Sequence, residues 1–194
     1  MKCGEWERFM RRLAIVLLLA GGILIVGCDR KSEEEPGGAG ARSGEVEGGG
    51  VSHDARGRLL ERINRAGDIN DFNVPRPLVT LEEFFDGNDD YGSIGYNFYP
   101  DQPAPSEFYA LFKGIRARAE VADVRVEVKD LEDAEGWPST DTVWVITGES
   151  VEEVKGWLGE RFAADDIIVG FSGEYPIEKY DVPDGMEAIG VWWD

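Results

Sequence analysis

The chain has 194 residues, of which 42% are apolar and 30% charged, and 39 acidic against 20 basic residues give it a formal charge of −19. This length suits one globular domain with accessory segments, and the acidity argues against a nucleic-acid partner. A single histidine and two cysteines, both outside the region expected to fold, exclude a disulfide framework and a cysteine zinc site and argue against a histidine-dependent triad.

The first 27 residues have the pattern of a signal peptide. The chain begins with a mostly basic segment, and an uncharged apolar run follows from Leu13 to Gly27. A bilayer span needs roughly 20 apolar residues, so this shorter run predicts an export signal rather than a transmembrane helix. An uncleaved signal anchor is the alternative.

The apolar run ends in Ile25-Val26-Gly27-Cys28. This tetrapeptide resembles the lipobox of bacterial lipoproteins, although isoleucine stands where leucine is commoner. The resemblance implies cleavage before Cys28, a diacylglycerol on its thiol and an acyl chain on its new amine. Each buried methylene contributes about 0.8 kcal/mol, so such chains would hold the protein on a membrane without spanning it. We therefore expect a lipid-anchored protein of the bacterial cell membrane that faces the periplasm or the exterior.

Asp29 bears on which membrane carries the anchor. An aspartate after the lipidated cysteine resembles the signal that retains lipoproteins in the inner membrane of enteric bacteria. That rule does not extend to other lineages, so the sequence leaves the choice between inner and outer membrane open.

Residues 28–54 are predicted to be the lipidated cysteine and a flexible tether. The segment is dominated by glycine, glutamate and serine and has no apolar periodicity. Such a composition cannot bury enough apolar surface to offset the entropy of ordering. The folded domain is therefore predicted over residues 55–194.

The domain is predicted to alternate helices and strands. Helical spacing and capping residues predict helices over 55–67, 80–87, 106–118 and 150–162, the last three with Thr80, Ser106 and Ser150 as N-caps. Apolar alternation or a continuous apolar run predicts strands over 93–99, 123–131, 142–148 and 187–193. Residues 163–185 are predicted to be irregular.

From Ser93 onward this order is β-α-β-β-α-β. It indicates an α+β, ferredoxin-like fold with an antiparallel sheet and extra N-terminal helical turns. Both helices should cover one sheet face, and the alternation places Asn97, Tyr99, Trp144, Ile146 and Trp192 on the other. That second face either binds a partner or is covered by residues 55–85 and 163–185. We favour coverage, because the N-terminal helix must bury its leucines somewhere.

One stretch resembles a metal-binding loop. Asp86, Asn88 and Asp90 occupy the first, third and fifth positions of an EF-hand-like spacing. Tyr91 stands where glycine is required, and Asn97 stands where the bidentate glutamate should be. Aspartate, asparagine and glycine are also ordinary turn residues. We therefore expect these three residues to form a turn, and we expect no cofactor.

The function predicted from these features is a non-enzymatic binding domain on a membrane tether, with a basic protein as its partner. Immunity proteins that neutralise basic toxins share this small, acidic character. Two alternatives remain: a calcium-dependent binding module, and an envelope hydrolase in which two of Asp86, Asp90, Asp133 and Asp141 cluster. No motif in residues 55–194 assigns the domain to a family.

Overall fold

The computed structural model describes residues 50–98, 100–172 and 175–193. The leader, Cys28, the tether up to residue 49 and Tyr99 lie outside the described residues. Within the described part, no helix is both long and apolar enough to cross a membrane. The helices are α2 (Gly50–Asn64), α3 (Leu81–Phe85), α4 (Pro105–Arg116) and α5 (Val151–Leu158), with short 3-10 turns at Tyr91–Ser93, Tyr96–Phe98 and Glu160–Phe162.

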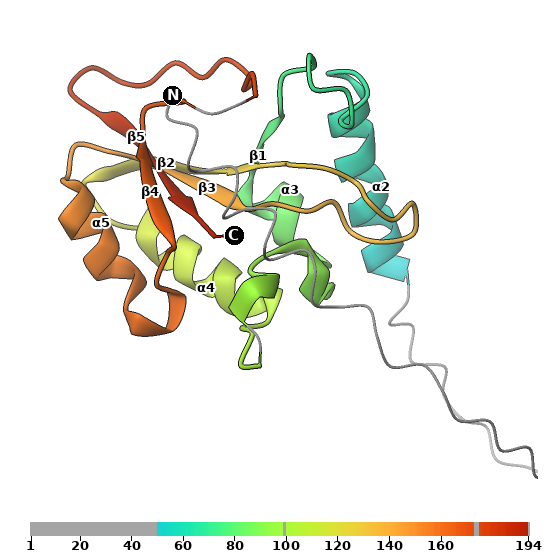
Figure 1. Cartoon of the computed structure of the whole chain (residues 1–194), viewed down its shortest axis with the longest axis horizontal. Helices are drawn as coiled ribbons and strands as arrows, with labels where there is room; N and C mark the ends of the chain where they lie inside the picture. Colours follow the sequence, from blue (N-terminus) through green and yellow to red (C-terminus); the bar gives the residue numbers. More distant parts are fainter. Residues whose placement is uncertain (1–49, 99, 173–174, 194) are drawn as a thin grey trace, which may run out of the picture. The chain divides into compact units, whose positions relative to one another are not determined.

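Five strands form one antiparallel sheet (Figure 1). They are β1 (Leu78–Thr80), β2 (Val121–Glu127), β3 (Thr142–Thr147), β4 (Asp166–Val169) and β5 (Glu187–Trp192), in the order β1-β2-β3-β5-β4. The central register pairs Val124 with Val145 and Val145 with Ile189. This arrangement confirms the α+β class and the antiparallel sheet.

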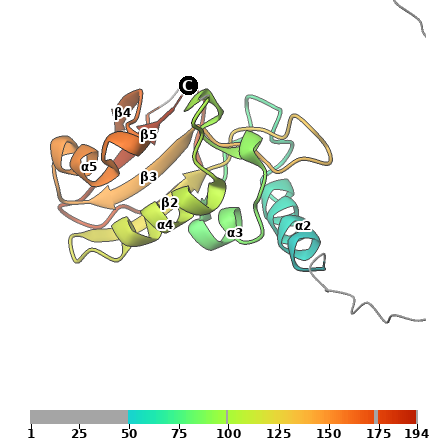
Figure 2. The same cartoon turned by 90° about the horizontal axis from the view of Figure 1, so that it is seen from below.

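The helices gather on one face of the sheet. In Figure 2, α3, α4 and α5 lie across the same side of the strands. Apolar side chains that alternate along β2, β3 and β5 meet those of the helices in one buried cluster, which includes Val124, Val126, Val143, Val145, Ile189, Val191, Phe84, Phe108, Phe112, Val154 and Leu158. Burying these side chains is the main stabilisation of the domain.

The second face of the sheet is covered by the chain itself. Leu78, Trp144, Ile146 and Ala188 form a separate buried cluster on that face. It is packed by side chains from the segment between β4 and β5, which are Phe171, Ile177, Tyr180, Val182 and Met186. Figure 1 shows this segment on the opposite side of the sheet from α4 and α5.

The expected coverage is thus confirmed for the segment within 163–185 and is wrong for the N-terminal helix. Helix α2 buries Leu59 and Ile63 in the cluster on the helix side of the sheet. The helix also begins at Gly50, five residues before the expected start at Ala55.

The helix starts follow from capping chemistry. Thr80 accepts a hydrogen bond from the Glu83 amide at 3.1 Å, and Glu83 accepts one from the Thr80 amide at 2.8 Å, as the capping-box spacing predicts. Ser150 caps α5 by accepting from the Glu153 amide at 3.2 Å. The expected cap at Ser106 is wrong, because α4 starts two residues earlier with Ala104 at the N-cap and Pro105 in the first turn.

The strand predicted over 93–99 is not formed in its described part, residues 93–98. Its residues make two 3-10 turns, and only Ile94 forms an isolated bridge, to Thr140. Asp90 accepts a hydrogen bond from the Gly92 amide at 2.8 Å, and this local bond favours a turn over a sheet ladder. Gly95 then takes a left-handed φ of +64°, which ends any extended run.

The strand order also differs from the ferredoxin-like arrangement. In that fold a strand over 93–99 would separate the strands over 142–148 and 187–193, whereas here β5 pairs directly with β3. The chain instead supplies two strands that the sequence did not predict. Strand β1 follows Pro77, which is tolerated because β1 is an edge strand, and β4 lies in the segment expected to be irregular.

Candidate functional site

Two hollows meet at the ion pair between Lys129 and Asp141. The Lys129 Nζ lies 2.9 Å from Asp141 Oδ2, and both side chains line both hollows. The first hollow lies at the loop between β2 and β3 and is called the acidic pocket here. The second lies on the second sheet face and is called the aromatic hollow.

The acidic pocket is shaped by the connection from β2 to β3. Lys129 donates its amide to the Ser139 carbonyl at 2.8 Å, and Ser139 donates to the Asp130 carbonyl at 2.9 Å, so the loop continues the hairpin ladder. Arg56 of α2 fixes the tip of this loop by donating to the Gly136 carbonyl at 2.7 Å. The pocket has a volume of about 470 Å³.

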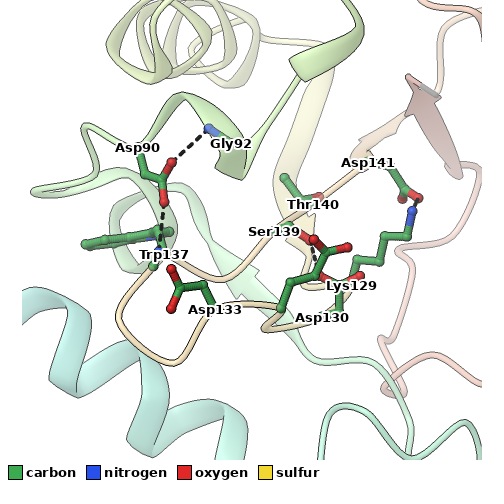
Figure 3. A pocket seen from close by; sticks show the side chains of 11 residues that line it. Asp90, Gly92, Lys129, Asp130, Asp133, Trp137, Ser139, Thr140 and Asp141 are labelled. Carbon is green, nitrogen blue, oxygen red and sulfur yellow. Dashed lines mark hydrogen bonds and ion pairs between the residues drawn. The ribbon is translucent and has the colours of Figure 1, made fainter. Parts of the chain in front are cut away.

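Carboxylates dominate the lining of the acidic pocket. Its charged residues are five acids and one base, namely Asp90, Asp130, Glu132, Asp133, Asp141 and Lys129. Figure 3 shows Asp90 and Trp137 on one side of the pocket and Lys129 with Asp141 on the other. Glu132 and Asp133 are exposed, so the pocket presents negative charge to solvent.

Several of these carboxylates already hold the chain together. Asp90 accepts from the Gly92 amide at 2.8 Å through one oxygen and from the Trp137 amide at 3.0 Å through the other. Asp130 accepts from the Ser139 hydroxyl. Three of the four acids considered for a hydrolase, Asp90, Asp133 and Asp141, therefore share one pocket, whereas Asp86 does not line it.

The side chains of the three residues in the EF-hand-like spacing hydrogen-bond to different groups of the chain. Asp86 accepts from the Tyr109 hydroxyl at 3.0 Å, and burial together with this bond raises the pKa of Tyr109 to about 12. Asn88 is buried and donates to the Ser93 hydroxyl at 2.9 Å. Among the described residues, no group of three or more acidic, histidine or cysteine side chains is placed to hold a metal ion.

The aromatic hollow combines rings with charged groups. Its volume is about 290 Å³, and its lining includes Arg76, Glu127, Trp144, Tyr175 and Trp192. Glu127 is only 8% exposed and accepts a hydrogen bond from Trp144 Nε1 at 2.7 Å. Desolvation is the main cause that raises the pKa of Glu127, and the hydrogen bond from Trp144 lowers this pKa in part. The negative charge of Asp141 raises the pKa further, and the positive charge of Arg76 lowers it.

Arg76 links the aromatic hollow to its surroundings. Its guanidinium donates to the Lys129 carbonyl at 2.7 Å and lies 4.2 Å from the centre of the Tyr175 ring. Its backbone bridges the segment that covers the second face, because its amide donates to the Pro176 carbonyl at 2.8 Å. Arg76 thus positions both β1 and the covering segment at the hollow.

The five residues expected on the second face do not lie together. Trp144 and Ile146 are fully buried beneath the covering segment, and Trp192 is half-buried at the aromatic hollow. Asn97 lies elsewhere and donates to Asp165 at 2.6 Å. Tyr99 is outside the described residues.

Sequence reasoning missed Arg76, Glu127 and Lys129 as members of a site. The alternation over 123–131 placed Glu127 and Lys129 on the outer side of the predicted strand, which is typical of a solvated face. Only the covering segment makes that side an interior, and no local signal indicates which of its residues pack beside Glu127 and Lys129. The one indication of a site in the sequence is that Trp144 and Glu127, on neighbouring predicted strands, face the same side of the sheet.

These features define a small α+β domain with an acidic pocket beside an aromatic hollow. The family model described as "Uncharacterized protein YfbO family" matches residues 54–191, and the chain belongs to this family. The sequence-based prediction assigned the domain to no family, and this match supplies one. The chain is 39% identical over 137 residues to "Uncharacterized protein YfbO" of Escherichia coli (strain K12), covering 71% of this chain and 96% of that protein. No solved structure matches the chain.

Proposed function

We propose that this chain is a lipid-anchored protein of the bacterial envelope whose acidic domain binds a basic protein. The observation that carries the binding function is the acidic pocket, whose lining holds five carboxylates and a single lysine. The lipobox-like sequence ending at Cys28 supports the anchor. The family match starts at residue 54, so it concerns the domain and leaves the leader and tether outside.

The charge of the pocket favours a cationic partner group. Its one lysine pairs with Asp141 at 2.9 Å, and five acids against one base leave the lining an excess of four negative charges, with Glu132 and Asp133 exposed. A lysine or arginine side chain of a partner would meet both of these carboxylates at the pocket mouth. Such complementarity accelerates association and discriminates against acidic partners.

The same geometry favours binding over hydrolysis. A general acid or base must offer an oxygen to the substrate. Both oxygens of Asp90 accept backbone amides of the chain, and Asp141 is held by Lys129. The clustering of Asp90, Asp133 and Asp141 keeps a carboxylate hydrolase as the second candidate.

A peptide-binding measurement tests the proposed function. The full chain, in liposomes of neutral lipid, is exposed to a lysine- and arginine-rich peptide and to a glutamate-rich peptide of equal length. We expect saturable binding of the basic peptide alone, with an affinity that falls as salt is raised. The double variant Glu132→Gln, Asp133→Asn should weaken binding at least about fivefold, equivalent to about 1 kcal/mol.

A matched variant separates the pocket from general acidity. Glu149→Gln with Glu152→Gln removes the same charge from exposed residues at the start of α5. This control should change the affinity less than about twofold. Equal losses in both double variants, or no binding of the basic peptide, would contradict a function for the pocket.

A further inference from the structure

The aromatic hollow contains a buried acid that the proposed function does not use. Glu127 sits at the end of β2, is 8% exposed and lines the hollow. Its Oε2 accepts from Trp144 Nε1 at 2.7 Å, and among the described residues no donor is found for its other oxygen. Glu127 Oε1 is not among the buried unpaired side-chain atoms of the described residues, so this oxygen is open to the hollow and can accept a hydrogen bond from a ligand there.

Charges in the hollow balance one another. The lining holds two basic residues, Arg76 and Lys129, and two acidic ones, Glu127 and Asp141. Lys129 and Asp141 form an ion pair, and Arg76 is engaged by the Lys129 carbonyl and the Tyr175 ring. The formal charges of the described lining residues sum to zero, so together these four side chains give a charged ligand no net attraction, in contrast to those of the adjoining acidic pocket.

Three aromatic side chains give the hollow flat apolar surfaces. Trp144, Tyr175 and Trp192 line it, and Trp192 and Tyr175 are half-buried, so part of each is open to a ligand. Ile168 and Ile177 complete the apolar lining, and Thr142 and Ser172 add hydroxyl-bearing side chains. At about 290 Å³ the hollow lies at the small end of ligand pockets.

We propose that the aromatic hollow binds one neutral sugar ring. The C–H face of a sugar packs against an aromatic ring, for which the half-buried Trp192 is available, and a sugar hydroxyl donates to a carboxyl oxygen such as Glu127 Oε1. An apolar molecule would leave Glu127 Oε1 without a donor, and a charged molecule would meet a lining that also carries like charge and holds the Lys129–Asp141 ion pair. A neutral polyol ring meets both requirements.

A titration with three related sugars tests this assignment. The full chain is kept in a detergent without a sugar head group and titrated with N-acetylglucosamine (neutral), glucosamine (cationic) and glucuronate (anionic). Calorimetry and tryptophan fluorescence report binding up to roughly 10 mM, which detects a Kd near 1 mM. We expect saturable binding of the neutral sugar that is at least tenfold tighter than that of either charged sugar.

Two substitutions connect binding to the hollow. Trp192→Ala should weaken binding at least tenfold, whereas Trp157→Ala, which changes a half-buried tryptophan of α5 stacked by Arg118, should leave it unchanged. Glu127→Gln should weaken binding several-fold, because a bond to a charged acceptor is lost while the amide oxygen still accepts from Trp144. Should Trp192→Ala fail to fold, Glu127→Gln carries the test.

The outcomes separate this site from the acidic pocket. The double variant Glu132→Gln, Asp133→Asn should bind the neutral sugar like the unmodified chain, since neither residue lines the hollow. The proposal is overturned if no sugar saturates, if a charged sugar binds as tightly as the neutral one, or if Trp192→Ala and Glu127→Gln, both folded, bind normally.

Discussion

Trp144 is the residue on which the packing of the second sheet face depends. Its ring lies 4.8 Å from that of Phe171, and its Nε1 donates to the buried Glu127. On β5 it meets Gly190, where an added Cβ would lie 2.8 Å from the ring. The tryptophan therefore requires glycine at its partner position in the register.

Gly190→Ala should destabilise the domain. A Cβ at this position must displace a fully buried ring, and such overpacking costs about 1–3 kcal/mol. The free energy of unfolding, measured by urea denaturation of the full chain, should fall by that amount.

Gly156→Ala provides the contrasting change. This glycine lies within α5, and an added Cβ would meet nothing within 4 Å. Because alanine favours helix over glycine, the variant should gain about 0.5–1 kcal/mol. Equal stability of the two variants would show that the contact between Trp144 and Gly190 relaxes without cost.

At the scale of elements, an ion pair joins α3 to α4. Both terminal nitrogens of the Arg116 guanidinium donate hydrogen bonds to the Glu82 carboxylate, one of them at 2.8 Å. These bonds lower the pKa of Glu82 from 4.5 to about 2. Glu82 is 44% exposed, so solvent screens much of this interaction.

Glu82→Gln should therefore cost about 0.5–1 kcal/mol of stability at neutral pH. A carboxyl group whose pKa is lowered by folding stabilises the fold at pH values above its ordinary pKa. The difference in the free energy of unfolding between Glu82→Gln and the unmodified chain should therefore shrink as the pH falls from 4.5 to about 2. Urea denaturation across this range measures it. Glu61→Gln, an exposed acid of α2, should show no such difference, and a pH-independent cost for Glu82→Gln would contradict the ion pair.

The sequence predicted the elements that have strong local signals. The apolar run over 142–147 and the capping residues Thr80 and Ser150 correspond to β3, α3 and α5. The alternation over 93–99 was misleading, because local bonds from Asp90 outweigh β-propensity there. Strand β4 has only four residues, and its pairing with β5 is set by distant packing.

The candidate site was less predictable than the fold. The acidic loop around Asp133 and Asp141 was visible as a set of carboxylates, although their gathering in one pocket was not. The aromatic hollow joins Arg76, Glu127 and Tyr175, which come from three distant parts of the chain. A periodicity within one segment carries no information on such long-range packing.

At the scale of the whole molecule, the proposed anchor predicts where the protein resides. Cys28→Ala should abolish labelling by a radioactive fatty acid and leave the uncleaved precursor, because the thiol receives the lipid before cleavage in the family that the lipobox resembles. Membrane fractionation and labelling in a bacterial host measure both effects.

Cys3→Ala is the matched control for this substitution. It removes the other cysteine of the chain, which lies before the apolar run, and should leave labelling and processing unchanged. Labelling and localisation of Cys28→Ala like those of the unmodified chain would contradict the lipid anchor.

The position of β5 has a consequence for biosynthesis. This strand is the last of the described strands in sequence, yet it lies between β3 and β4 in the sheet. A ribosome that has not yet released residues 187–192 holds a nascent chain whose sheet is interrupted and whose β4 has no partner. The sheet can therefore close only after residues 187–192 have been synthesised, because until then β4 lacks the strand with which it pairs.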